Sequence, residues 1–297
     1  MRVPDFILKS IAFLVSIATE GSSDEYDFEG SGFLVGVRSK RCVGQSFFYF
    51  VTADHVVSRI KSKSGIRINL KASGTTVIPV ERWFRHPFDK YADVAVAEFV
   101  NKYTEYDVAF IGDECFLGHP VELMAKEIGI GDEVWFPGLF SLTQQESDKR
   151  NIPILRLGNI AMMPRLPVPT EMGPMEAYLV EARSIGRISG SPVFARRTIS
   201  ILWNDEAGIP GKPIKALHGM TGEVNLIGMM HGHWDVKESE INQPRIEVAK
   251  KGQGVNLGIA IVVPFHKIME TINHPELVEV RRLAEDEFIR GCNPTAG

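Results

Sequence analysis

Short runs of apolar and β-branched residues, separated by segments with turn residues, follow one another through the first third of the chain. They cover residues 32–37, 46–52, 65–70, 76–80 and 94–99. Polar and apolar residues alternate in Arg67-Ile68-Asn69-Leu70, which predicts a strand with one buried face. Short strands at regular spacing with turn residues between them are typical of a β-barrel or sandwich. The first part of the chain is therefore predicted to be a β unit.

A second series of strand-like runs follows a loosened stretch at about residues 112–130. These runs cover residues 132–136, 152–157, 177–180, 192–195, 225–231 and 257–263. We expect an N-terminal barrel at 1–112, a linker at 113–128, a C-terminal barrel at 129–272, and a helix with tail at 273–297, together one unit.

The end of the chain has a helical pattern. Pro264 suits the first turn of one helix. A second helix is expected from about 275 to 289, with an apolar stripe made by Leu277, Val280, Ala284 and Phe288.

The apolar residues at 7–18 have two interpretations, a strand or the core of a signal peptide. Lys9 and Ser10 interrupt the run and Asp5 weakens its basic flank, so a strand is preferred. No run approaches the ~18 apolar residues that a membrane-spanning helix needs.

Composition agrees with an ordinary soluble protein, with 44% hydrophobic and 24% charged residues. The net charge of −4 offers no general attraction to nucleic acid or to anionic membranes. Lys61, Lys63 and Arg67 form a basic group without interleaved aromatic residues, which indicates a solvated face. We therefore expect neither nucleic acid nor a membrane as partner.

The three cysteines, Cys42, Cys115 and Cys292, are odd in number and far apart. They match neither a disulfide framework nor the spacing of a zinc site. A reducing compartment is favoured, and the expected location is cytoplasmic.

Three short segments contain residues suited to nucleophilic catalysis. His55 follows an apolar strand in Phe50–Val57, Asp93 precedes one in Tyr91–Val96, and Ser189 lies in the turn Gly-Arg-Ile-Ser-Gly-Ser-Pro. Taken singly, Ser189 could be a turn serine, His55 a packed histidine and Asp93 a cap. Together they supply a hydroxyl nucleophile, a base to activate it and a carboxylate to orient the base.

The three segments, in the order histidine, aspartate, serine, resemble the chymotrypsin-like (trypsin-like) serine peptidases, nearest to intracellular and HtrA-type bacterial members. The resemblance extends from about residue 11 to 272. It implies an all-β fold of two six-stranded barrels with a short C-terminal helical tail, and a site between the barrels. It also implies an endopeptidase that acts on protein or peptide substrates through an acyl-enzyme, without cofactor or metal.

The resemblance assigns roles to further residues. The backbone N–H groups of Arg187 and Ser189 would form the oxyanion hole. Ile188 stands where digestive relatives have an aspartate, so activation by N-terminal cleavage is not expected. Arg187 stands where the family has glycine, and a required positive φ would leave the hole malformed at rest.

Substrate selection is less defined by the sequence. By the resemblance, the strand that contains His231, Gly232 and His233 would wall the substrate pocket. Arg183 occupies the place of the pocket-base residue and would favour an acidic side chain, helped by His231 or His233; alternatively, Arg183 points to solvent. His231 and His233 share a strand face, but no third ligand has suitable spacing, so no metal is expected.

Two other functions remain open at this point. A catalytically silent member could bind a protein partner through the same cleft. A nucleic-acid-binding barrel would require a basic, aromatic stripe, which the chain lacks. Two long loops at about 198–223 and 235–254 are candidates for control by a regulatory protein.

Overall fold

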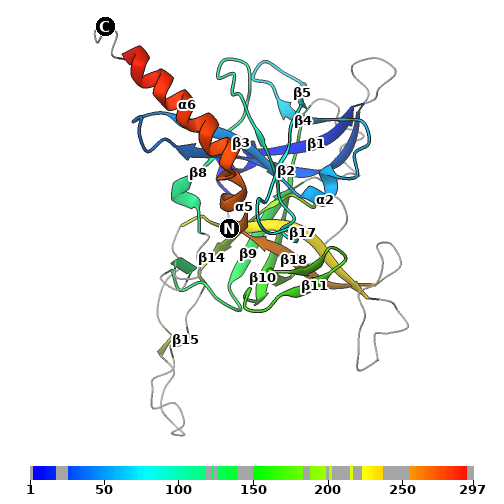
Figure 1. The fold of residues 1–297 in the computed structure, drawn as a ribbon. Helices are drawn as coiled ribbons and strands as arrows, with labels where there is room; N and C mark the ends of the chain where they lie inside the picture. The colour runs from blue at the N-terminus through cyan, green and yellow to red at the C-terminus, as the bar shows by residue number, and fades with distance from the viewer. Residues whose placement is uncertain are drawn as a thin grey trace, which may run out of the picture.

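The described part of the chain is mostly β structure, followed by two helices (Figure 1). The computed structural model describes residues 3–17, 26–117, 122–123, 126–138, 150–182, 188–198, 201–202, 215–216, 223–236 and 255–292. Within these ranges, no helix has the length and apolar character needed to span a bilayer.

The N-terminal unit is an eight-stranded sheet. Seven strands pair in the order β5-β4-β1-β2-β3-β7-β6, and β8 pairs with β2 in parallel. Their bounds are β1 Ile11–Ile17, β2 Tyr26–Arg38, β3 Ser46–Thr52, β4 Lys63–Asn69, β5 Thr75–Val80, β6 Phe84–Arg85, β7 Ala95–Glu98 and β8 Ile111–Gly112.

Strand β1 lies in the middle of this sheet, between β2 and β4. Its residues from Ile11 to Val15 are all buried, and the short helix α1 (Asp5–Lys9) that precedes it buries Ile7. The strand predicted at 7–18 is confirmed for residues 11–17, whereas residues 7–9 belong to α1. Its apolar residues do not alternate with polar ones because both faces of β1 are covered.

The edges of the sheet differ from the prediction. The family resemblance implies a six-stranded barrel here, but the described strands form an eight-stranded sheet whose ends, β5 and β6, do not pair. Only Glu81, Arg82 and Trp83 separate these two strands, so the sheet must curl until its edges come close. Pro79 has no N–H to donate, which suits an edge strand, and β6 is only two residues long.

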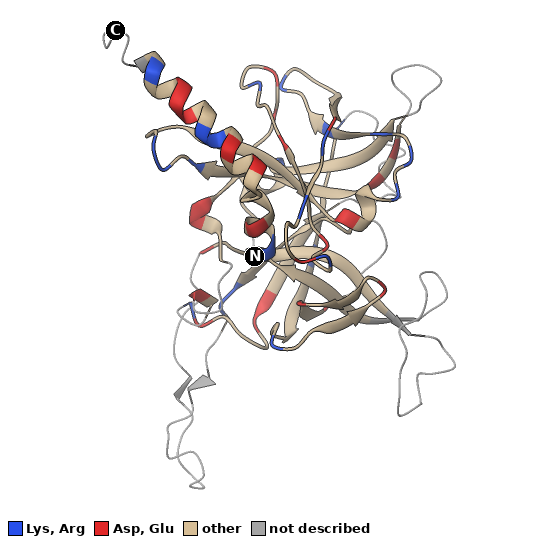
Figure 2. Cartoon of the chain, viewed as in Figure 1, with Lys and Arg blue, Asp and Glu red and all other residues tan. Residues whose placement is uncertain are grey.

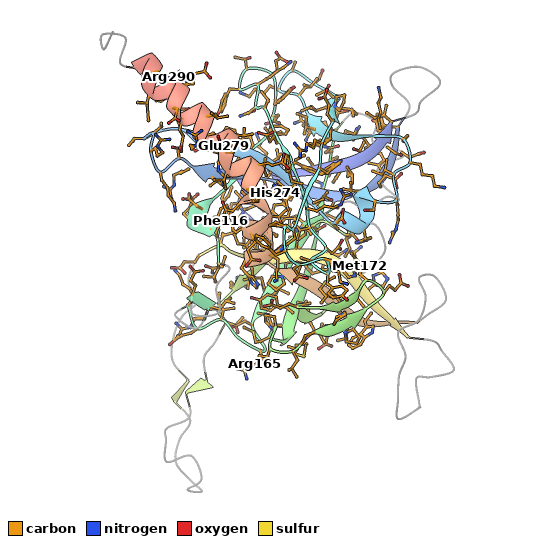
Figure 3. The ribbon with its side chains drawn as sticks, in the orientation of Figure 1. Phe116, Arg165, Met172, His274, Glu279 and Arg290 are labelled. Atoms are coloured by element: carbon orange, nitrogen blue, oxygen red, sulfur yellow. The ribbon has the colours of Figure 1, made fainter. Side chains whose placement is uncertain are left out.

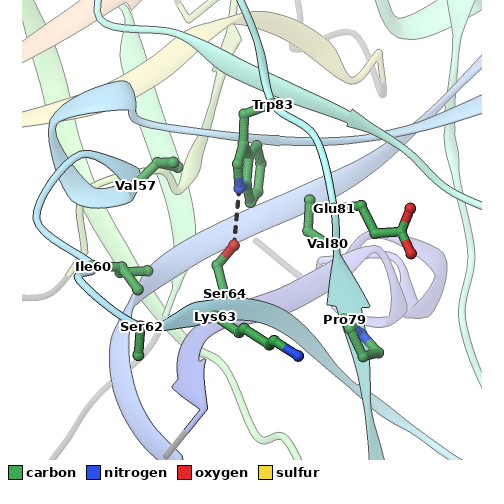
Figure 4. Close-up of a pocket in the computed structure, with 9 residues that line it drawn as sticks. All are labelled: Val57, Ile60, Ser62, Lys63, Ser64, Pro79, Val80, Glu81 and Trp83. Atoms are coloured by element: carbon green, nitrogen blue, oxygen red, sulfur yellow. Dashed lines mark hydrogen bonds between the residues drawn. The ribbon is translucent and has the colours of Figure 1, made fainter. Parts of the chain in front are cut away.

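A cavity of about 580 Å³ lies beside the turn that connects β5 to β6 (Figure 4). Its walls come from β4, β5, the turn between β5 and β6, the end of α2 (Asp54–Val57) and the residues that follow α2. Trp83 forms one wall, and its Nε1–H donates to Ser64 Oγ at 2.9 Å. The cavity therefore has both polar and apolar walls.

The C-terminal unit is a closed barrel of six strands, as predicted. The strands follow the order β10-β13-β18-β17-β14-β9, and one hydrophobic cluster fills the barrel. Their bounds are β9 Glu133–Gly138, β10 Ile154–Met162, β13 Tyr178–Glu181, β14 Pro192–Arg196, β17 Asn225–Val236 and β18 Val255–Pro264. Outside it lie the pairs β11 Val168–Thr170 with β12 Gly173–Met175 and β15 Ile201–Leu202 with β16 Lys215–Ala216, and the 3-10 turn η1 Asp113–Cys115.

The two units share a second, larger hydrophobic cluster. It joins strands of the N-terminal sheet to barrel residues such as Trp135 and Phe194, whose stacked rings have centroids 4.2 Å apart. Phe116, labelled in Figure 3, packs against the buried Phe265 with ring centroids 4.6 Å apart. Because both units bury side chains in one cluster, residues contributed by each are held at a fixed relative position.

Two helices end the described chain, α5 (Phe265–Ile272) and α6 (Pro275–Cys292). The helix start after Pro264 is confirmed. The helix predicted from about 275 to 289 is confirmed, but its apolar stripe is mostly not covered, because Leu277 is buried whereas Val280 and Phe288 are exposed.

Polar side chains connect α6 to the sheet instead. Arg281 donates to the Tyr49 hydroxyl at 2.8 Å, and Glu285 accepts a hydrogen bond from Ser39 at 2.6 Å. Acidic and basic residues alternate along its outer surface (Figure 2). The spacing of apolar residues along a helix does not show whether another apolar surface packs against them.

Arg67 of β4 is fully buried and connects the sheet to Asn151, which precedes β10 of the barrel. Its Nη1 donates to Asn151 Oδ1 at 2.5 Å, and Asn151 Nδ2 donates back to the Arg67 carbonyl at 2.7 Å. The guanidinium also lies over the Phe28 ring, 5.2 Å from its centroid. A buried charge of this kind stabilises a fold only while its partners are present.

We predict that Asn151→Ala lowers the free energy of unfolding by about 2–3 kcal/mol, since a buried guanidinium loses an acceptor. Urea unfolding checks this. The control is Asn159→Ala, which removes one exposed hydrogen bond to the Gly131 carbonyl and should cost less than about 1 kcal/mol. Equal losses in the two variants would contradict the role given to Asn151.

Candidate active site

His55 lies on the short helix that follows β3. Thr52, the last residue of that strand, donates its hydroxyl hydrogen to the Ser31 carbonyl at 2.7 Å, which fixes the strand end. Ala53, Val56 and Val57 are buried around the turn. The helix is therefore anchored by apolar contacts, while the His55 side chain stays 11% exposed.

Asp93 precedes β7 and is completely buried. Its Oδ1 accepts the backbone N–H of His55 at 2.7 Å, and its Oδ2 lies 2.7 Å from His55 Nδ1. An ionised carboxylate only accepts hydrogen bonds, so Nδ1 carries the proton and Nε2 keeps its lone pair. Asp93 therefore holds both the backbone and the ring of His55 in one orientation.

Ser189 lies in a tight turn between the two units. Ser31 of β2 donates its backbone N–H to the Ser189 carbonyl at 3.0 Å. On the other side, Gly190 N–H donates to the Met230 carbonyl and Met230 N–H to the Ser191 carbonyl, both at 2.8 Å. The turn is thus held between β2 and β17, and Ser189 is 9% exposed.

His231 follows Met230 in β17 and also contacts Asp93. Its Nδ1 lies 2.5 Å from Asp93 Oδ2, and its ring centroid lies 5.0 Å from that of His55. Met230 pairs with Val262 and Gly232 with Ile261, so His231 is an extra residue in the ladder. Such a bulge turns a side chain away from its regular direction.

These contacts bring the segments of His55, Asp93 and Ser189 into one hydrogen-bonded network. Asp93 connects His55 to His231, and the residue before His231 is bonded to the Ser189 turn. Within the described residues, Ser189 Oγ makes no hydrogen bond to His55. Catalytic hydrogen bonds of this kind are often long in the free enzyme and shorten when substrate binds.

The charges of the site follow from burial and from these hydrogen bonds. Burial alone would raise the pKa of Asp93, but the hydrogen bonds from His231 and His55 outweigh it and hold the pKa well below its usual range. Burial lowers the pKa of His55, only partly opposed by Asp93. At neutral pH the pair is therefore an ionised aspartate and a neutral imidazole.

His55, Asp93 and His231 are also the residues that could hold a metal ion, since a ligand atom of each lies within 4.8 Å of the others. Zinc ligands stand about 2.0–2.2 Å from the metal, and therefore about 3.3 Å from each other in a tetrahedral site. The Nδ1–Oδ2 separations of 2.7 and 2.5 Å are shorter than that. The observed contacts are those of two donors sharing one acceptor.

The predictions made from the sequence for the other site residues differ in outcome. Arg183 and Arg187 lie outside the described residues. His231 was expected to wall a substrate pocket, but its Nδ1 contacts Asp93. Gly232 and His233 continue β17 opposite β18, and open space surrounds the side-chain position of Gly232. Nothing in the local sequence marks the bulge that turns His231 to Asp93.

The solved structures that match this chain include two that are distant in sequence. No protein-family model and no curated protein matches the chain. The MamO protease domain from Magnetospirillum magneticum (apo form) matches with 12% identity and a TM-score of 0.48, covering 89% of this chain and 96% of that one. Deg5 matches with 12% identity and a TM-score of 0.46, covering 91% and 90%. At such values no residue role is transferred, and the function rests on the geometry of this chain.

We predict that Gly190→Ala destabilises the fold far more than Gly44→Ala. Both glycines have positive φ, +88° and +83°, so both substitutions cost about 1–2 kcal/mol of backbone strain. A Cβ at Gly190 would stand 1.9 Å from the Ser31 carbonyl oxygen, whereas none stands within 4 Å at Gly44. The unfolding free energies should differ by at least about 2 kcal/mol. Similar values would mean that the Ser189 turn is not held against β2.

Proposed function

We propose that the chain is a serine endopeptidase in which Ser189 is the nucleophile, His55 the general base and Asp93 the residue that orients the base. The observation that carries the proposal is the buried Asp93 carboxylate. It accepts both N–H groups of His55, and it is linked through β17 to the turn that contains Ser189. A buried aspartate that fixes the tautomer of a neutral histidine is the arrangement that activates a hydroxyl.

The reaction proceeds by acyl transfer. Ser189 Oγ attacks the carbonyl carbon of the scissile peptide bond while His55 Nε2 takes the hydroxyl proton. His55 then gives this proton to the leaving amine nitrogen, and the acyl-enzyme forms. Water then attacks the acyl carbon while His55 takes one of its protons. The ester bond to Ser189 breaks, His55 returns the proton to Ser189 Oγ, and the acid product leaves.

The oxyanion hole belongs to the same proposal. The backbone N–H groups of Ser189 and Arg187 would donate to the developing oxyanion, and each such donor contributes about 10²–10³ in rate. The Gly190 conformation supports a tight turn at this point, since φ is +88°.

The proposal also covers the domain architecture, the class of substrate and the cellular location. We assign the sheet and the barrel to the two halves of a chymotrypsin-like peptidase unit, divided at 1–112, 113–128, 129–272 and 273–297. The substrate is a protein or peptide, and no cofactor takes part. Cys42 and Cys115 are free, buried thiols, which supports a reducing, cytoplasmic setting. A regulatory partner would act at the loops of 198–223 and 235–254, most of which lies outside the described residues.

A second candidate function is binding without catalysis. It is favoured by Arg187, which replaces the glycine of the related peptidases in the oxyanion turn. If this arginine keeps the turn closed, Arg187→Gly gains at least tenfold in kcat over the natural chain. An unchanged kcat would show that Arg187 does not suppress catalysis, and the proposal of binding without catalysis would lose its support.

Labelling by a fluorophosphonate tests the proposed nucleophile. Ser189→Ala should abolish labelling and lower the rate of peptide hydrolysis by at least about 10⁴-fold. Ser191→Ala is the matched control, because its hydroxyl is buried in the same turn and has no partner within the described residues. Intact-mass spectrometry should show one adduct on the natural chain and on Ser191→Ala. Labelling that survives Ser189→Ala would exclude Ser189 as nucleophile.

The pH dependence of kcat/KM provides a further prediction. Burial lowers the pKa of His55 below the ordinary histidine value of 6.5, so the imidazole stays neutral at lower pH than usual. Activity should therefore fall through a midpoint below 6.5 as the solution is acidified. A midpoint above this value would show that another group is the base.

A further inference from the structure

We propose that His231 is a positioning residue, which acts on catalysis through Asp93 by sharing that carboxylate with His55. The inference rests on the proposed function and adds a residue to its machinery. It also gives His231 a different role from the substrate contact expected from the sequence.

The first support is the position of His231. Its Nδ1 lies 2.5 Å from the same Asp93 oxygen that His55 Nδ1 approaches to 2.7 Å. Asp93 is fully buried, and the His231 side chain is only 14% exposed. An ionised carboxylate without solvent depends on each donor it receives, so loss of one leaves part of its charge uncompensated.

The second support is the backbone that presents His231. The bulge at this residue departs from the regular pairing of β17 and β18. The preceding Met230 exchanges hydrogen bonds with the Ser189 turn through both its N–H and its carbonyl. The same two residues of β17 therefore hold the nucleophile turn and the carboxylate, which couples their positions.

The physical consequence concerns the charge on Asp93. A hydrogen bond from His231 takes up part of the negative charge that would otherwise stabilise a protonated His55. The titratable and charged groups that act on the His55 ring are Asp93 before β7, His231 of β17 and Arg59 after α2. Of these, His231 and Arg59 both lower the pKa of His55, whereas Asp93 raises it.

Loss of the His231 donor should therefore have two effects. Asp93 loses one of its restraints, so His55 is less well oriented and kcat falls by about 10- to 100-fold. At the same time the full carboxylate charge acts on His55, so the pKa of His55 rises and the acid limb of kcat/KM moves to higher pH. A structural role alone would change stability without moving this limb.

The test compares His231→Ala with His231→Asn and His231→Gln in the full chain. Asparagine places an N–H donor where His231 Nδ1 stands, and glutamine places it where Nε2 stands. The proposal predicts that Ala and Gln lower kcat with little change in KM, and that Asn restores most of it. Because Asn and Gln are both polar and of moderate size, comparing them shows whether the N–H at the Nδ1 position is needed, even if the Ala variant does not fold.

His266→Ala is the matched control. It removes a histidine that is paired with Glu176 instead of Asp93, so it should leave the pH profile unchanged.

A second readout does not require activity. NMR titration of ¹⁵N-labelled protein follows the His55 ring directly, and its pKa should rise in the Ala and Gln variants but not in Asn. If the natural chain neither cleaves peptides nor reacts at Ser189, the proposed function fails, while this titration still decides whether His231 shares Asp93. An unchanged His55 pKa in all three variants, or a rise in KM at constant kcat, would overturn the proposal.

Discussion

Three N–H groups converge on the carboxylate of Asp93, and this buried charge determines how the rest of the site is arranged. Two of the donors belong to His55 and one to His231. A carboxylate removed from water is costly unless such donors are present, so the two units must meet with these groups in place. Because the Asp93 carboxylate needs N–H donors, it also fixes the tautomer of His55, the candidate base.

The wider structure keeps these donors in position. The hydrophobic cluster shared by the sheet and the barrel prevents the two units from moving independently, and Arg67 with Asn151 adds a polar connection. The Ser189 turn is bonded to both units, through Ser31 and Met230. A site assembled from remote segments therefore depends on the packing between the units as much as on its own residues.

Local sequence patterns were sufficient for most strands and for the starts of the two C-terminal helices, because these follow from neighbouring residues. The closed C-terminal barrel was implied by the family resemblance and not by the local pattern. Local patterns were insufficient where distant segments decide the outcome. His231 and Asp93 are 138 residues apart, and only a bulge brings them together. The unclosed edge between β5 and β6 and the polar attachment of α6 likewise depend on which surfaces meet in three dimensions. The spacing of apolar residues shows which face of a strand or helix can be buried, but it does not show which other element packs against that face.

The most direct test of this account is a crystal structure of the chain after reaction with a fluorophosphonate. The account predicts phosphorus bonded to Ser189 Oγ, His55 Nε2 within about 2.6–3.2 Å of an oxygen of the adduct, and Asp93 between the Nδ1 atoms of His55 and His231. An unmodified Ser189, or an adduct remote from His55 with Asp93 released from either histidine, would contradict it.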